Sequence, residues 1–474
     1  MAHDQQETPH VPSSLPTARS AQPLHKDVPP SRAQRFWWLL SPDWMTRDMT
    51  LLLVARACMS TTRALAGIVV PIYLAVLGFG GLTLGILFTV TALVSALLTS
   101  LIGLLSDRVG RKPFLVITPW LAAIAGLVFA FSHTAGVLFV FATLGSFGRG
   151  AGAGAGIIGP YQPAEQALLA DAVPAKHRNS LFGRIAFASS LGALIGGSPL
   201  VTLAVLIAGN SKGHTFAAYR TEFLFTAAFA LLAGLFALPI HEAYRHTASH
   251  KKASRPLQPQ EKQPRLRLSA PSWSILVRLW ITNSMNGLAV GFFGPFITYW
   301  FYRRYGAGPS EVALLYTIIN LAAMIVNLSA AQIAARLGLV RAIVLTRTLQ
   351  AVLIIPMVLA PVFWLAGLLY LLRMMVQRIG LPLRQSYVMG VIPSEERGRV
   401  GALSNLPAQA TSALSPTLAG YLFDHVALAL PFDIGAVLQA ANTLLFFLFF
   451  RHIVPPEEQS KGKESRAADA YDKS

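Results

Sequence analysis

The sequence predicts an all-α membrane protein with twelve transmembrane helices, arranged as two pseudo-symmetric bundles of six. Of its 474 residues, 54% are hydrophobic and only 13% are charged, which is about half the charged share of a soluble domain. The apolar residues form runs of roughly 20, the length at which a helix crosses a bilayer. Several stretches of the second half also repeat stretches of the first half in the same order.

Apolar runs bounded by charges, glycine or proline define the expected helices. In chain order they span 50–77, 82–105, 113–132, 135–162, 180–208, 222–240, 274–302, 309–334, 340–360, 362–390, 399–423 and 430–453. The flanking segments 1–47 and 454–474 are expected to be disordered cytoplasmic tails. Because the first 47 residues contain neither an apolar core nor a small-residue cleavage site, a signal peptide is not expected.

The segment 241–271 separates the two halves. It contains seven Lys and Arg residues and four prolines, and no strong apolar run interrupts it. We therefore expect a basic cytoplasmic linker between an N-terminal half at 48–240 and a C-terminal half at 272–453.

Basic residues also gather in short connections, and this sets the expected orientation. The turns at 78–81 and 133–134 carry no Lys or Arg. Such residues do occur in the connections 106–112, 171–179, 241–271, 335–341 and 393–399. Because Lys and Arg stay on the cytoplasmic side, both termini are predicted to be cytoplasmic in a multi-pass protein of the plasma or inner membrane. The same rule explains the net charge of +18 without a nucleic-acid partner.

One pattern of 17 residues occurs twice. "QPAEQALLADAVPAKHR" at 162–178 returns as "LPLRQSYVMGVIPSEER" at 381–397, and "GIVVP" at 67–71 matches "GFFGP" at 291–295. Each half has an even number of helices, so both halves have the same orientation. A pseudo-two-fold axis along the membrane normal is therefore expected.

The loop between the second and third expected helices reads "GLLSDRVGRK", residues 103–112. It resembles, at every position, the Gly-x-Leu-x-Asp-Arg-x-Gly-Arg-Lys signature of the major facilitator superfamily. The resemblance implies a secondary transporter that moves a small molecule by alternating access between its two halves. The repeat "PxRQxYVM…PxxER" is similar to that of a group of prokaryotic members, which leaves the substrate open.

The residues of this loop predict a latch between the halves. Gly110 permits a tight turn, and its basic neighbours hold the loop in the cytoplasm. Asp107 would be attracted to the N-terminus of a helix in the other half, and the resemblance implies that it closes the cytoplasmic side. The alternative is a loop that only sets topology. The latch residues are Gly103, Asp107, Arg108, Gly110, Arg111 and Lys112.

Polar side chains inside the expected helices indicate a substrate pathway, because a charge at the bilayer centre costs about 2.5 kcal/mol or more. Arg56 and Arg378 are equally well explained by snorkelling or by a cytoplasmic network. Interhelical hydrogen bonding is the alternative for the amides. The predicted pathway residues are Arg63, Arg149, Asn283, Asn286, Arg373 and Gln377.

The acidic residues suggest the charge of the substrate. With the expected boundaries, every Asp and Glu falls in a tail, a loop or a helix end, so the buried arginines have no resident counter-ion. This favours an organic anion or an amphiphile as substrate. General drug efflux and the transport of a sugar or metabolite remain alternatives.

The repeated pattern predicts a cytoplasmic gate, because Glu165 in the first copy corresponds to Arg384 in the second. The pseudo-two-fold axis places these residues at matching depth, where they would meet only when the cytoplasmic side is closed. Asp171, Arg178 and Arg397 are expected to belong to the same network. The alternative is that the two copies have drifted apart.

The remaining function classes find no support in the sequence. No His/Asp/Glu cluster has metal-ligand spacing, no nucleophile motif or phosphate-binding loop is present, and Cys58 is the only cysteine. We expect no enzyme activity, no cofactor and no metal. The expected partners are a small-molecule substrate, a coupling proton or ion, and the lipid bilayer around a monomer. A disrupted latch loop would favour the alternative of a sensor or scaffold that no longer transports, but this loop is intact.

Overall fold

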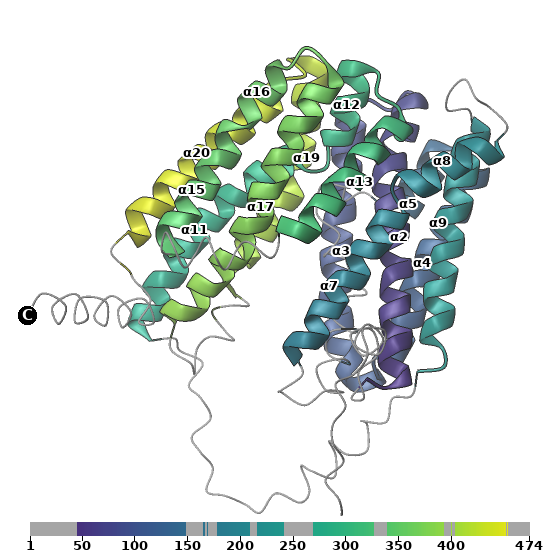
Figure 1. The fold of residues 1–474 in the computed structure, drawn as a ribbon, viewed down its shortest axis with the longest axis horizontal. Helices are drawn as coiled ribbons and strands as arrows, with labels where there is room; N and C mark the ends of the chain where they lie inside the picture. Colours follow the sequence, from purple (N-terminus) through teal and green to yellow (C-terminus); the bar gives the residue numbers. More distant parts are fainter. Residues whose placement is uncertain are drawn as a thin grey trace, which may run out of the picture. The chain divides into compact units, whose positions relative to one another are not determined.

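The computed structural model describes residues 45–147, 165, 168, 178–208, 216–240, 269–326, 339–392, 400, 403–451 and 453. Helices, and no strands, form the regular structure of these residues (Figure 1). They group into twelve successive spans: α2 (Arg47–Val76), α3 (Gly81–Val109), α4 (Lys112–Phe131), α5 (Ala135–Leu144), α7 (Arg178–Ile195) with α8 (Ser198–Ile207), α9 (Phe216–Ala237), α11 (Ala270–Phe293) with α12 (Ile297–Tyr305), α13 (Pro309–Val326), α15 (Leu339–Val352) with α16 (Ile354–Leu359), α17 (Phe363–Val391), α19 (Leu406–His425) and α20 (Leu430–Phe450). The predicted all-α fold with twelve spans is confirmed.

Three spans that the sequence predicts as continuous are broken, and in the span predicted at 135–162 the helix α5 already ends at Leu144. One break, at Gly196–Gly197, separates α7 from α8. Gly196 lies against α2, where an added Cβ would come within 3.0 Å of the Cα of Thr61. The other breaks, between α11 and α12 and between α15 and α16, also fall inside apolar runs. Hydropathy does not register such breaks, because the residues on both sides remain apolar.

Each half is a bundle with the same arrangement of helices. In the N-terminal half, α2 packs against α7 and α9, and α4 packs against α9. In the C-terminal half, α11 packs against α20, and α15 packs against α17 and α20. The first and sixth spans are therefore in contact in both halves, as expected of repeats. The predicted tails and linker lie outside the described residues, apart from a few residues at their edges.

The two ends of the bundles can be told apart by their turns. We call the end with the turn Gly110–Arg111, between α3 and α4, the motif end. We call the end with the turns 77–80 and 132–134 the far end. Within the described residues, the hydrogen bonds that join the halves come from α3 and α8 on one side and from α13 and α19 on the other.

Candidate functional site

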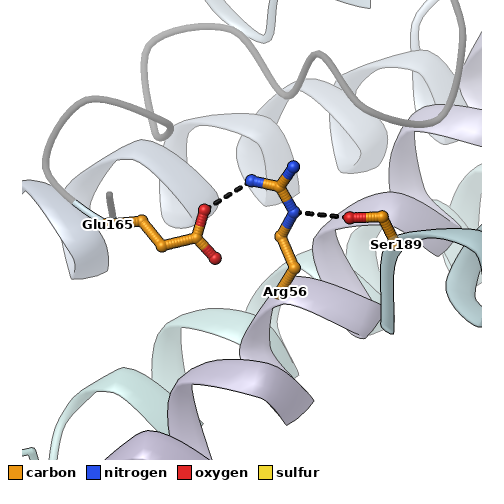
Figure 2. Close-up of polar contacts among 3 residues, drawn as sticks. All are labelled: Arg56, Glu165 and Ser189. Atoms are coloured by element: carbon orange, nitrogen blue, oxygen red, sulfur yellow. Dashed lines mark hydrogen bonds and ion pairs between the residues drawn. The ribbon is translucent and has the colours of Figure 1, made fainter. Parts of the chain in front are cut away.

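A buried ion pair occupies the N-terminal half (Figure 2). Arg56 of α2, 2% exposed, forms an ion pair through Nη1 with Oε2 of Glu165, which is fully buried. On the other side of the guanidinium, Nε donates a hydrogen bond of 2.7 Å to Oγ of Ser189 in α7. The second carboxylate oxygen, Oε1 of Glu165, is buried without a hydrogen-bond partner. One carboxylate oxygen is therefore satisfied and the other is not.

The packing of α2 against α7 places Arg56 in this pair. Gly192 of α7 lies on Ala57, so close that a side chain there would overlap the α2 backbone. Ser189 is almost one turn before Gly192 and therefore reaches the residue next to Ala57. Of the two explanations given for Arg56, snorkelling to the surface is wrong, because its charge is buried and paired with a carboxylate, whereas a charge network agrees with these contacts.

A second buried carboxylate lies in α9. The sequence predicts a helix that begins at residue 222, but α9 begins at Phe216, so Glu222 is inside the helix and fully buried. Thr226, one turn on, donates its hydroxyl to the carbonyl of Glu222, and Thr62 of α2 approaches the carbonyl of Thr226. The prediction that no carboxylate lies inside a helix is wrong for Glu222, and the one that buried arginines lack a resident counter-ion is wrong for Arg56.

Two of the predicted pathway residues bond to backbone carbonyls. Arg63 donates a hydrogen bond to the backbone carbonyl of Ser146, and Asn283 donates one of 2.6 Å to that of Ser404. The bond from Asn283 joins α11 to the segment before α19, as interhelical hydrogen bonding would require. Asn286 and Gln377 are half-buried. Arg149 lies outside the described residues.

Arg373 of α17 is 6% exposed, and its guanidinium carbon lies 3.9 Å from the centroid of the Phe293 ring. Among the described pathway residues, no other has a guanidinium over an aromatic ring. Arg347 of α15, which the sequence analysis missed, is also buried. Its Nη1 donates 2.9 Å to Oδ1 of Asn442 in α20, and its guanidinium lies over Phe446. The signal that could have found Arg347 was available, since it is an arginine inside a predicted span.

The latch loop has the predicted turn. Gly110 adopts φ 107°, a conformation that favours glycine, and its N–H bonds the carbonyl of Ser106 at 3.1 Å. Arg111 and Lys112 are half-buried. Gly103, Asp107 and Arg108 are placed in α3, but their side chains are outside what the structure describes.

The predicted gate residues are placed in part. Glu165 contacts Arg56, whereas Nη2 of Arg384 donates 2.8 Å to Oδ1 of Asn405. Arg178 is the first residue of α7, with its side chain undescribed. Asp171 and Arg397 lie outside the described residues. Contact between Glu165 and Arg384 in another conformation stays a prediction.

An acidic residue that the sequence analysis did not select joins the halves at the far end. Asp424, at the end of α19, accepts hydrogen bonds from the backbone N–H groups of Gly81 at 2.7 Å and Leu82 at 2.8 Å. Nearby, Thr417 donates 2.8 Å to Thr89. Nothing in the sequence distinguishes Asp424 from other acidic residues at helix ends.

Comparison with known proteins places this architecture in a family. The model of the Major Facilitator Superfamily matches residues 52–280 and 279–472, one match for each half. The multidrug resistance protein MdtG of Proteus mirabilis is 24% identical over 390 residues, which cover 80% of this chain and 90% of that protein.

Two solved structures show the same fold. An inward-facing bacterial homologue of the human lysosomal transporter Spinster has a TM-score of 0.62 at 13% identity, covering 87% of this chain and 98% of that one. A D-xylose–proton symporter has a TM-score of 0.61 at 15% identity, covering 86% and 97%. The chain therefore belongs to the Major Facilitator Superfamily and is a multi-pass membrane protein, a secondary transporter of small molecules rather than an enzyme.

Proposed function

We propose that this transporter couples the movement of a small organic anion or amphiphile to protons, and that the Arg56–Glu165 pair senses protonation. The observation that carries the proposal is the burial of both charges in the N-terminal half, with Oε1 of Glu165 lacking a hydrogen-bond partner. A buried carboxylate with an unsatisfied oxygen is unfavourable, and a proton on that oxygen removes part of the cost.

Protonation would also change what Arg56 can bind. While Glu165 is ionised, the guanidinium is neutralised by it. Once Glu165 is neutral, Arg56 keeps its hydrogen bond to Ser189 but loses the negative charge of its carboxylate partner. An anionic group or a second conformation would relieve that charge, so the proton and the substrate affect the same equilibrium.

The relatives support this reading. MdtG is named for multidrug resistance, which fits an amphiphilic substrate, and the D-xylose symporter is named for its coupling to protons. We further propose a monomer with cytoplasmic termini, in which the motif end faces the cytoplasm, because the basic connections gather there.

The test is the response of the conformation to pH. In a Cys58→Ser background, spin labels at Arg47 and Trp273, both exposed and at the motif end of opposite halves, report the distance between the halves. We expect a pH-dependent distance distribution in the unmodified pair and a pH-independent one in Glu165→Gln, which resembles the protonated state. Ser189→Ala, the matched control, removes one hydrogen bond and should keep the pH response. An unchanged pH response in Glu165→Gln would contradict the proposal.

Flux completes the test. In proteoliposomes that contain a pH-sensitive dye, substrate addition should move protons with the intact protein. In Glu165→Gln, exchange of substrate for substrate should persist while proton movement is lost, because exchange needs no change in protonation.

A further inference from the structure

We propose that Arg373 binds the carboxylate of the substrate in the C-terminal half, with the ring of Phe293 in contact with the apolar body. The proposal rests on the proposed transport of an organic anion and names its class, an aromatic or strongly apolar monocarboxylate. Three observations support it: the buried charge of Arg373, two tyrosine hydroxyls near it, and two amides on its motif-end side.

Within the part of the chain that the structure describes, no carboxylate pairs with the buried guanidinium of Arg373. Three arginines are buried among the described residues: Arg56, Arg347 and Arg373. The first has a carboxylate and the second an amide oxygen as partner. Arg373 has the face of Phe293, and its Nε has no hydrogen-bond partner. A guanidinium offers five donors and suits a carboxylate in two-point contact, so the ligand that Arg373 lacks is an anion.

Two tyrosines provide a further donor next to this charge. Tyr370 lies one turn before Arg373 on α17, and its ring stacks on Phe293 with centroids 5.9 Å apart. Its hydroxyl is 3.4 Å from that of Tyr316 in α13, and both side chains are buried. A pair of hydroxyls uses only one of its two protons for the mutual bond. The other proton is not used in this bond, and the hydroxyl of Thr298 also lies beside Tyr316.

Two amide side chains lie on the motif-end side of Arg373. On α17, Gln377 is four residues after Arg373 and therefore on the same face. On α11, Asn286 is seven residues before Phe293, again on one face. The two helices run in opposite directions, so both amides lie on the motif-end side of the Arg373–Phe293 contact. Both are half-buried, whereas Arg373 and Phe293 are buried.

These faces define the ligand. A single guanidinium suits one negative charge. The rings of Phe293 and Tyr370, which pack on each other here, would have to part to receive an aromatic or apolar body. The amides of Asn286 and Gln377 can donate to a polar substituent farther out. The competing possibility is that Arg373 only fastens α17 to α11 through its contact with the ring.

The experiment compares two isosteric probes on the purified full chain, 2-naphthoate and the neutral 2-naphthamide. We expect naphthoate to raise Tm and to bind at least about tenfold more tightly than naphthamide, because it adds a charge-assisted contact. Arg373→Gln should abolish that preference and Arg373→Lys should keep part of it. Arg341→Gln, which removes the same charge from an exposed position at the start of α15, should bind naphthoate like the unmodified chain.

Three outcomes would overturn the proposal. They are the absence of naphthoate binding to the unmodified chain, equal binding of both probes, and unchanged naphthoate preference in Arg373→Gln. Folding of the variants is checked by their Tm without ligand, and the pH-dependent distance between Arg47 and Trp273 is measured alongside. That readout also separates the two proposals: loss of the pH response alone removes the role of Glu165, and loss of the naphthoate preference alone removes the role of Arg373.

Discussion

Asp424 of the C-terminal half caps the helix that begins at Gly81 in the N-terminal half. Its carboxylate oxygens accept the N–H groups of Gly81 at 2.7 Å and Leu82 at 2.8 Å. The first N–H groups of a helix have no partner within it, and they attract negative charge. Asp424 is therefore one of several contacts that join α19 to α3 at the far end, together with the hydrogen bond from Thr417 to Thr89. Asp107 lies at the other end of α3, and the partner helix α19 begins at Leu406, at the motif end.

Loss of the Asp424 cap should open the far end. An N-terminal cap contributes about 0.5–2 kcal/mol, so Asp424→Ala should raise the ratio of open to closed far end by roughly 2- to 30-fold. The measurement is the distance between spin labels at Phe131 and Leu359, exposed at the far end of opposite halves. Asp424→Asn keeps one acceptor oxygen and should have a smaller effect. Equal distance distributions in the unmodified chain, Asp424→Ala and Asp424→Asn would exclude the cap as a determinant of far-end closure.

The α3–α19 contact should not tolerate a side chain at Gly420. An added Cβ there would overlap the carbonyl of Gly81 and come within 2.7 Å of its carbon. We expect Gly420→Ala to populate states with the far end open, by the same distance measurement. Gly136→Ala is the matched control, because an added Cβ at Gly136 meets nothing within 4 Å. A closed far end in Gly420→Ala would show that the helices can separate locally without opening.

Asp107→Asn should shift the equilibrium in the opposite direction to Asp424→Ala. If Asp107 closes the motif end in the alternate conformation, removing its charge favours the conformation described here. The fraction of molecules with the long, open Arg47–Trp273 distance should then increase, with expression unchanged. An effect on neither distances nor transport would leave the loop as a determinant of topology only.

The gate prediction can be tested with a double-mutant cycle on Glu165→Gln and Arg384→Gln. Residues in contact give coupling energies of about 0.5–3 kcal/mol, whereas distant residues are additive. We expect coupling in the population closed at the motif end and none in the conformation seen here, where Arg384 bonds Asn405. Additivity under all conditions would indicate drift between the repeats.

Arg347 should be a structural arginine, in contrast to Arg373. Asn442→Leu removes its acceptor and leaves a buried charge without a hydrogen bond, at a cost of about 1–3 kcal/mol. Tm should fall in Asn442→Leu and be retained in Asn442→Asp, which still accepts. A Tm that falls equally in both variants would mean that packing around Asn442, not the bond to Arg347, is decisive.

The fold was predictable because a membrane imposes strong local rules. Spanning segments must satisfy their backbone groups internally and be apolar for about 20 residues, so hydropathy finds them. The loop at 103–112 and the repeated pattern then identify the family and the two halves. The breaks inside α7–α8, α11–α12 and α15–α16 were missed, since apolar composition does not change across them.

The candidate site was less predictable, because its contacts join distant parts of the chain. Arg56 and Glu165 are 109 residues apart, and no local pattern states that they meet. Glu222 was assigned to a helix end because the apolar run begins there, although α9 begins six residues earlier. Arg373, by contrast, is buried as the sequence indicated, since a charge in the middle of a span is conspicuous, and its place in the substrate pathway stays a prediction.

At the point where Gly420 meets Gly81, two backbones touch without an intervening side chain. Opening and closing the far end there requires no rotamer exchange, only the movement of one half against the other. Such collective motions take microseconds to milliseconds, whereas exposed side chains reorient in picoseconds to nanoseconds. Separation at this contact is therefore expected on the timescale of the collective motion, not on that of side-chain reorientation.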